Sequence, residues 1–149
     1  MKVAEYIERI CRAIPEVGHT DNEMHFVDLN DDKRQSGIAQ RLKYPYVMIV
    51  QDGERWDNDG EKVVRHYSLS VMTHVKDTGN YQEVAMALSL CRDILMTIFA
   101  MLMEGRRARK ERWLTTADWS GEEIVDIENV DNAQWGKGCG FSVTECPMS

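Results

Sequence analysis

The feature that most constrains the fold is a long apolar segment between Asn80 and Gly105. Asn80 and Glu83 have the spacing of a capping box, which starts a helix, and a glycine such as Gly105 often follows the last turn. The main apolar stripe has helical spacing and consists of Val84, Leu88, Cys91, Leu95, Ile98 and Leu102, widened by Leu90, Ile94 and Met101. Burying the main stripe contributes on the order of 10 kcal/mol before conformational entropy is subtracted. The segment therefore predicts a helix that organises the core and is wide enough to contact a neighbouring subunit as well.

Shorter periodic segments lie on both sides of this helix. Before it we expect a helix over residues 3–14, ended by Pro15 and Gly18, a charged loop over 30–37, and strands over 24–29, 44–50 and 63–75. After it we expect strands over residues 113–119, 123–130 and 135–146. In the last strand three glycines share one face, which permits close approach by another backbone or an aromatic ring. This order predicts a single α+β domain over residues 1–149, with both helices packed on a largely antiparallel sheet.

An acidic segment over residues 52–61 joins two of these strands and raises the question of a calcium loop. Counting back from Gly60, Asp59 and Asp57 occupy ligand positions, but Arg55 and His66 stand where other ligands belong. An Asn-Asp-Gly sequence is instead typical of a tight turn. We therefore predict the tip of a β-hairpin over residues 52–61, with Trp56 exposed on it, rather than an ion site.

The remaining polar residues do not form a catalytic or metal-binding motif. His66 and His74 share a strand face but are eight residues apart, roughly 26 Å at the rise of a strand. The four cysteines lack zinc spacing, so we expect unpaired thiols, and Gly136-Lys137-Gly138 lacks the spacer of a phosphate loop. We predict no catalytic residue, no metal and no cofactor. An enzyme would require Asp57, Asp59 and His66 or His74 to converge in one pocket.

The charge of the chain is negative overall but unevenly distributed. Its 18 basic and 25 acidic residues give a net charge of −7, which argues against general affinity for nucleic acid. A basic segment contains Arg106, Arg107, Arg109, Lys110 and Arg112. These cations either stabilise the carboxyl end of the long helix or form a docking patch for an acidic protein surface or DNA phosphate. Methionines 86, 96, 101 and 103 fill the core by default, with an adaptable subunit interface as the alternative.

The sequence does not predict a membrane partner. No uninterrupted apolar run approaches the length of about 20 residues that a membrane span needs. Glu5 and Glu8 interrupt the amino-terminal segment, which is therefore not expected to be a signal peptide. We expect synthesis in the cytoplasm.

The order of these segments resembles the small tail-terminator and tail-completion proteins, of minor-tail and neck type, of long-tailed bacteriophages. The similarity rests on the amino-terminal helix, the Tyr-Pro-Tyr-Val-Met-Ile-Val strand over 44–50, and the acidic hairpin leading into an alternating strand over 65–75. The long helix over 80–104 and the late Trp-Gly-Lys-Gly strand that begins at Trp135 complete it. The carboxyl-terminal part, with three expected strands, is longer than this family usually has.

The resemblance implies a structural protein of virion assembly rather than an enzyme. Members of the family form homo-oligomeric rings, typically hexamers, that cap the tail tube and join it to the head or neck. The implied partners are further copies of the chain, tail-tube and neck or head-completion proteins, and DNA that passes through the lumen without sequence-specific binding. The expected location is the bacterial cytoplasm during assembly, and the virion tail of the phage or prophage afterwards.

Two sets of residues are implied as contacts. The hypothetical partner or lumen loop consists of Asp52, Glu54, Trp56, Asp57, Asp59 and Glu61. The hypothetical subunit or partner contact consists of Arg106, Arg107, Arg109, Lys110 and Arg112. The alternative function is a small cytoplasmic protein-binding module of the adaptor or immunity type, without catalytic activity, which recognises its partner through one sheet face.

Overall fold

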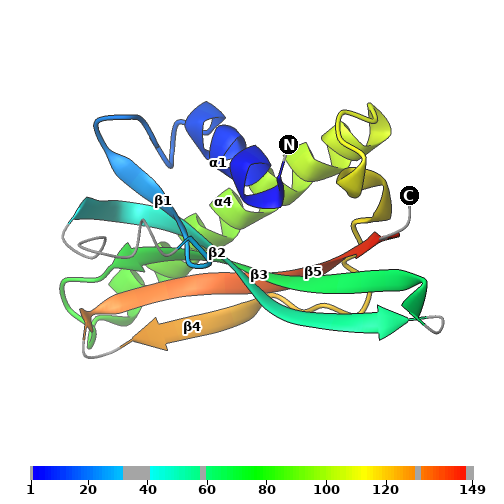
Figure 1. Cartoon of the computed structure of the whole chain (residues 1–149). Coiled ribbons are helices and arrows are strands. Elements are labelled where there is room, and N and C mark those ends of the chain that lie inside the picture. Colours follow the sequence, from blue (N-terminus) through cyan, green and yellow to red (C-terminus); the bar gives the residue numbers. More distant parts are fainter. Residues whose placement is uncertain (1, 32–40, 58–59, 130–131, 147–149) are drawn as a thin grey trace.

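The long apolar helix lies across one face of a five-stranded sheet, and the amino-terminal helix packs beside it (Figure 1). The computed structural model describes residues 2–31, 41–57, 60–129 and 132–146. The elements are α1 (Val3–Ala13), β1 (Met24–Asp28), β2 (Leu42–Asp57), β3 (Lys62–His74), α4 (Tyr81–Arg107), the 3-10 helix η2 (Trp113–Thr116), β4 (Val125–Asn129) and β5 (Gln134–Glu145). Of the charged loop expected over 30–37, residues 32–37 lie outside the described residues.

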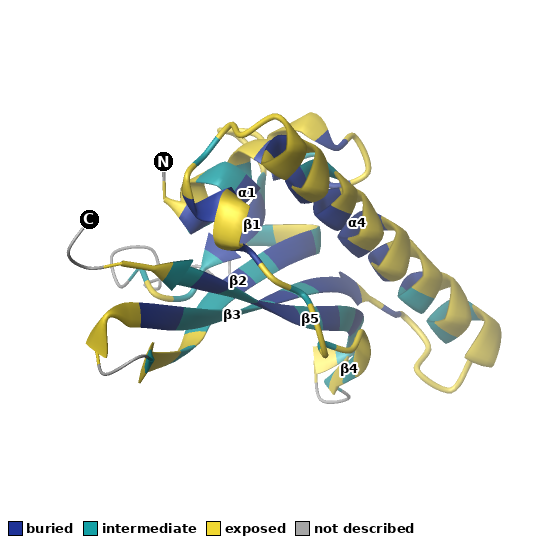
Figure 2. Ribbon diagram, turned by 90° about the vertical axis from the view of Figure 1, so that its right-hand side faces the viewer, coloured by how far each residue is buried: buried dark blue, intermediate teal, exposed yellow. Residues whose placement is uncertain are grey.

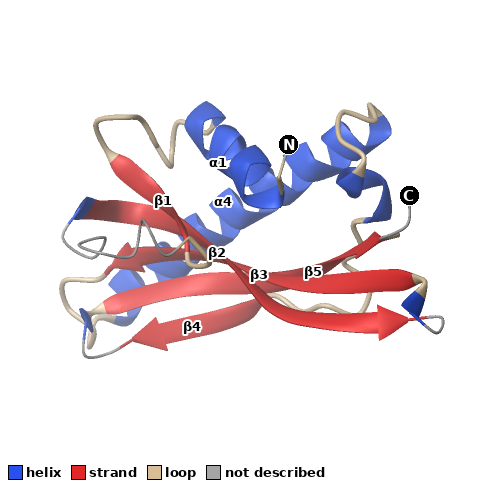
Figure 3. Cartoon of the chain, viewed as in Figure 1, coloured by secondary structure: helices blue, strands red, loops and turns tan. Residues whose placement is uncertain are grey.

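The sheet has the order β1-β2-β3-β5-β4. β1 is parallel to β2, whereas the pairs β2–β3, β3–β5 and β4–β5 are antiparallel. Figure 3 shows both α-helices on the same side of this sheet. The predicted α+β class with a largely antiparallel sheet is therefore confirmed.

The core lies between α4 and the central strands. Leu95, Ile98 and Leu102 of α4 are completely buried. The sheet residues that meet this layer include Leu69 and Val71 on β3 and Phe141 and Val143 on β5, all completely buried. Figure 2 shows the buried side of α4 turned toward the sheet and its other side exposed along most of its length. The alternation of β3 and the stripe of α4 meet here, as their sequence periods predict.

The amino terminus of α4 is capped as predicted, but its carboxyl end is not where we expected. The side chain of Asn80 accepts hydrogen bonds from the N–H groups of Gln82 and Glu83 at 3.1 and 3.2 Å. The Glu83 carboxylate accepts from the N–H of Lys76 at 2.7 Å, so it does not close the capping box on Asn80. The helix continues past Gly105 to Arg107, and the prediction that Gly105 ends it is wrong.

Gly105 is required by packing rather than by a turn. It is buried where α4 meets α1 and η2. A Cβ atom built on Gly105 would overlap the hydroxyl of Tyr6 and lie 3.1 Å from Leu114 Cδ1. The absent side chain therefore lets α1 and η2 close around the last turns of α4.

The predicted strand over residues 113–119 is also wrong. Trp113 and Leu114 are both buried although they are neighbours in sequence, which a strand with one solvent face does not allow. They lie in η2, where the hydroxyls of Thr115 and Thr116 donate to nearby backbone carbonyls and favour a helical turn. The isolated bridge between Asp118 and Ser142, and hydrogen bonds between the Thr116 hydroxyl and the backbone of Thr144, connect this segment to the sheet.

Among the described residues, only α4 is long and apolar enough to cross a membrane by length and composition. The core helix of a soluble protein meets the same criterion, and α4 buries one side against β3 and β5. The length and hydropathy of α4 are thus weak evidence for a membrane span.

We predict that Gly105→Ala lowers the free energy of unfolding by about 1–3 kcal/mol, because the added methyl group overlaps the Tyr6 hydroxyl. Urea denaturation measures the effect. The control is Tyr6→Phe, which removes the obstructing oxygen and should recover part of the loss in the double variant. A Gly105→Ala protein more stable than the wild type would contradict the packing argument.

Candidate protein-interaction surfaces

The predicted loop over residues 52–61 is mostly strand, so its expected extent is wrong. β2 continues to Asp57 and β3 begins at Lys62, and Gly60 between them has a φ of 91°. The register shifts between Gln51 and Gly53, so that Asp52 forms a bulge in β2. Beyond this bulge the two strands pair again over residues 53–57 and 62–66. The bulge increases the local twist of the hairpin. The paired residues beyond it form an extended two-stranded arm rather than a loop.

Glu54, Arg55 and Trp56 of this arm are exposed, whereas Val63 and Val64 are buried, and the charges of the arm are largely paired. Arg65 lies 3.4 Å from Glu54 and forms a close ion pair with Glu145, and Arg55 lies 3.5 Å from Asp57. Trp56, by contrast, is 62% exposed near the tip of the arm, where it pairs with Val63. Asp59 lies outside the described residues. The arm thus presents an uncovered aromatic ring among paired charges, rather than the uniformly acidic tip that the sequence suggests.

A second group of polar residues gathers around His66, on the sheet face opposite the helices. Nδ1 of His66 lies 2.5 Å from Asp52 Oδ1, and Nε2 lies 2.8 Å from Glu122 Oε1. The hydroxyl of Ser68 donates to Asp52 Oδ2 at 2.5 Å. These contacts tie the β2 bulge, β3 and the segment before β4 together, beside a cavity of about 450 Å³ that Gly138, among others, lines.

The His66 group does not have the arrangement of a nucleophilic site. In a catalytic triad the imidazole lies between the hydroxyl and the carboxylate, whereas here Asp52 lies between Ser68 and His66. Both imidazole nitrogens already contact carboxylates. An enzyme would require Asp57, Asp59 and His66 or His74 to converge in one pocket, but Asp57 pairs with Arg55 instead. Within the described ranges, no group of three or more His, Cys, Asp or Glu residues could hold a metal ion.

The carboxylates around His66 determine its protonation. The hydrogen bond to Asp52, together with Glu122, raises the pKa of His66 above its ordinary value, although burial opposes the change. For Asp52, burial raises the pKa, but the hydrogen bonds from Ser68 and His66 outweigh it and lower the pKa overall. Both shifts favour an imidazolium between two carboxylates. A neutral imidazole has a single N–H and can donate to only one of them.

The glycines of β5 make room for these contacts. A Cβ atom at Gly140 would lie 2.6 Å from His66 Nε2 and 2.7 Å from Glu122 Oε2, and one at Gly138 would lie 2.9 Å from Ile127 Cδ1. The predicted close approach to this glycine face is confirmed. At Gly136 the approaching group is the backbone of β3, at Val71 and Met72, as expected. At Gly138 and Gly140 the approaching groups are side chains of β4, β3 and the segment before β4.

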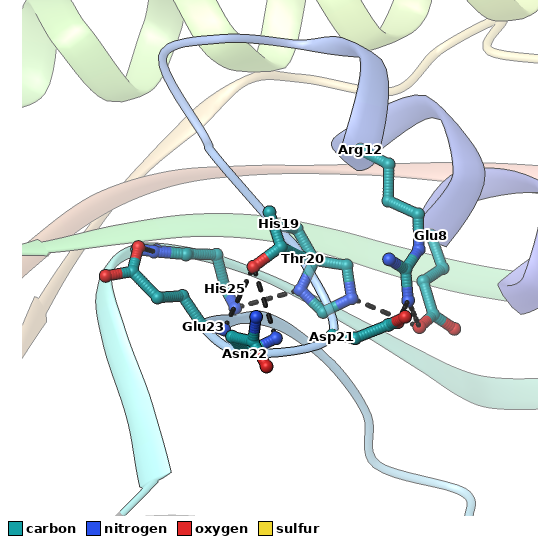
Figure 4. A network of polar contacts seen from close by, with 8 residues as sticks. All are labelled: Glu8, Arg12, His19, Thr20, Asp21, Asn22, Glu23 and His25. Atoms are coloured by element: carbon teal, nitrogen blue, oxygen red, sulfur yellow. Dashed lines mark hydrogen bonds and ion pairs between the residues drawn. The ribbon is translucent and has the colours of Figure 1, made fainter.

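Two buried histidines belong to another network, which holds the connection between α1 and β1 (Figure 4). Nδ1 of His19 accepts from the N–H of His25 at 3.0 Å, so the ring proton is on Nε2 and is donated to Glu8 at 3.1 Å. Nδ1 of His25 donates to the carbonyl of Pro45 at 2.7 Å. Arg12 adds an ion pair of 2.8 Å with Asp21. Because each ring is buried and bonded to the backbone, the network fixes β1 against β2 and is structural.

The outer face of α4 is unusually apolar. Met86, Met96 and Met103 are exposed, at 74%, 46% and 45%, and only Met101 of the four helix methionines packs against the core. The prediction that these methionines fill the core is therefore wrong for Met86, Met96 and Met103. A large exposed apolar surface is typical of a contact with another macromolecule.

The basic segment follows this apolar face. Arg106 donates to the carbonyl of Ala117 at 2.9 Å and has a structural role at the end of the helix. Arg107, Arg109 and Lys110 are exposed, and their side chains form no ion pair within the described part of the chain. Arg112 is exposed too. Of the five predicted cations, Arg107, Arg109 and Lys110 therefore support the hypothesis of a contact surface more strongly than Arg106 does.

A groove of about 1020 Å³ beside α1 was not predicted. Its apolar floor includes Phe26, Ile49, Tyr67 and Trp113, and Asp28 is among the charged residues at its rim. These residues come from separate elements, so no local sequence pattern marks the groove. The same holds for Glu122, which is 56 positions from His66 and shares no motif with it.

The sequence matches no protein-family model and no curated protein.

The His66 contacts predict a pH-dependent stability. Because the pKa of His66 is raised in the folded state, its contribution is fully present below the unfolded pKa and is lost as pH rises through the folded pKa. Urea denaturation should show His66→Gln less stable than the wild type by up to about 1 kcal/mol near about pH 6, with the difference shrinking toward about pH 9.

Asp52→Asn provides the control for this prediction. In the Asp52→Asn background the pH dependence of the His66→Gln effect should shrink, because the first partner of the imidazolium is neutral. An effect of His66→Gln that grows with rising pH would contradict the assignment.

Proposed function

We propose that the protein is a structural protein that forms a ring at the end of a bacteriophage or prophage tail tube, caps the tube and joins it to the head or neck. The observation that carries the proposal is that apolar side chains stay uncovered on two separate parts of the molecule. They are Trp56 on the β2–β3 arm and Met96 and Met103 on α4. A ring subunit at the end of a tube needs separate contact surfaces, at least one for neighbouring subunits and one for the tube.

The order of the elements supports the proposal. An amino-terminal helix, a hairpin of two long strands, a long apolar helix and late strands are the features on which the resemblance to tail-terminator proteins rests. The arm would contact the tube or line the lumen, and the end of α4 would contact a neighbouring subunit or a partner ring. DNA would pass through without sequence-specific binding, and assembly would take place in the bacterial cytoplasm.

The groove beside α1 favours the alternative function, a small cytoplasmic binding module of the adaptor or immunity type. Its volume of about 1020 Å³ and its mixture of aromatic and acidic lining would suit a peptide of a partner protein. The genes beside the coding sequence separate the two functions, because a tail terminator is encoded next to tail-tube and neck genes.

The direct test is electron microscopy of the purified protein mixed with tail tubes from the phage or prophage that encodes it. The proposal predicts a ring at one end of each tube, and tubes of uncontrolled length when the protein is omitted during assembly. A protein that stays monomeric and does not bind tubes would overturn it.

We predict that Trp56→Ala weakens binding to the tube about 30-fold, as expected for truncation of an exposed aromatic anchor at an interface. Stability should change little, because Trp56 is largely exposed in the isolated chain. Tyr81→Ala is the matched control, since Tyr81 is 89% exposed at the start of α4 and outside both surfaces. Equal binding by wild type and Trp56→Ala would show that the arm does not contact the tube.

A further inference from the structure

The first of two complementary surfaces follows the outer face of α4. Met96, Ala100, Met103 and Arg107 are exposed and separated by four, three and four positions, so they lie in one line along the helix. Residues 94–103 contain no charge. Arg109 and Lys110 follow the line at its carboxyl end. We call Met96, Met103, Arg107, Arg109 and Lys110 the basic surface.

The second surface is the edge of the sheet at β4. The strand order ends at β4, so its outer backbone groups face no strand of the described chain. Ile124 and Val125 are 38% and 50% exposed, and Glu123 and Glu128 are exposed beside them. We call Glu123, Ile124, Val125 and Glu128 the acidic edge.

The two surfaces have the same construction with opposite charge. Each has exposed apolar side chains flanked by charges, and the side chains of Glu123 and Glu128, like the cations of the basic surface, form no ion pair within the described residues. Asp126 of β4 forms an ion pair with Lys137 and is therefore not part of the acidic edge. Within the described ranges, neither surface has an ion-pair partner for these charges.

One copy cannot join its own two surfaces. The carboxyl end of α4 lies beside α1 on the helical side of the sheet, whereas β4 lies at the far edge, and Figures 1 and 2 agree on this separation. A contact between different surfaces of identical chains is heterologous, and such contacts generate rings when the rotation closes.

From this we infer that the acidic edge of one copy binds the basic surface of the next, and that this contact is the repeating interface of the ring. The inference rests on the proposed function and specifies its subunit contact. The apolar side chains supply most of the buried area, while the charges set the orientation and exclude contacts between like surfaces. Assembly should therefore weaken at high salt.

The experiment uses charge reversal and mass measurement by light scattering, alone and with tail tubes. Arg107→Glu with Arg109→Glu reverses the basic surface, and Glu123→Arg with Glu128→Arg reverses the acidic edge. Each variant alone should lose the assembled mass. An equimolar mixture should recover it, because every contact then pairs opposite charges again. Arg9→Glu and Glu16→Arg, on exposed positions outside both surfaces, are the controls and should assemble as the wild type does.

The outcomes separate this inference from the proposed function. Assembly by the wild type and also by both reversed variants would overturn the inference and leave the ring intact. Variants that fail alone and stay monomeric when mixed, although circular dichroism shows them folded, would overturn the pairing of these two surfaces. DNA binding by the basic surface, together with unchanged assembly after its charge is reversed, would also overturn the pairing of these two surfaces. A wild type that is monomeric even with tubes would overturn both proposals.

Discussion

The structure depends on the burial of one side of α4 against β3 and β5. Leu95, Ile98 and Leu102 reach the sheet without any exposed surface, and the helix has no freedom to rotate about its axis without exposing them. The packing and exposure of residues at the carboxyl end of α4 follow from this position of the helix on the sheet. Gly105 lets α1 and η2 close on the last turns, and the outer face is directed away from the sheet with its methionines uncovered. The helix thus builds the core and at the same time presents a surface that its own chain does not cover.

The opposite face of the sheet is closed in a different way. No described helix lies on it (Figure 3). Instead Val27, Tyr46 and Met72 form a small buried cluster, and the glycines of β5 allow the side chains of Met72 and Ile127 to lie close to the strand. At the end of this face His66 links Asp52 to Glu122. These contacts tie the bulge of β2 to β3 and to the segment before β4, and their side chains stay partly exposed.

The elements that local periodicity encodes could be predicted from the sequence. The stripe of α4, the alternation of β3 and the cap at Asn80 each need only a few neighbouring residues. The errors have tertiary causes. Glycine often ends a helix, but Gly105 instead allows helices to pack closely. The apolar residues of 113–119 suit either a strand or the helical turn observed.

The candidate surfaces were predicted only in part. Trp56 and the basic segment are local features and could be found, although the arm is strand rather than loop. Glu122 and the residues of the groove come together only through the tertiary arrangement of strands and helices, which a single sequence does not reveal. The exposed methionines have the same composition as core residues, so only the position of the helix on the sheet distinguishes them.

In the proposed ring, the uncovered arm and the uncovered face of α4 are both contact surfaces at the end of a tail tube. Cryo-electron microscopy of a capped tube end would test it most directly. We expect a closed ring in which Trp56 is buried against the tube or lumen and Met96 and Met103 are buried against another chain. A map in which both surfaces face solvent would contradict it.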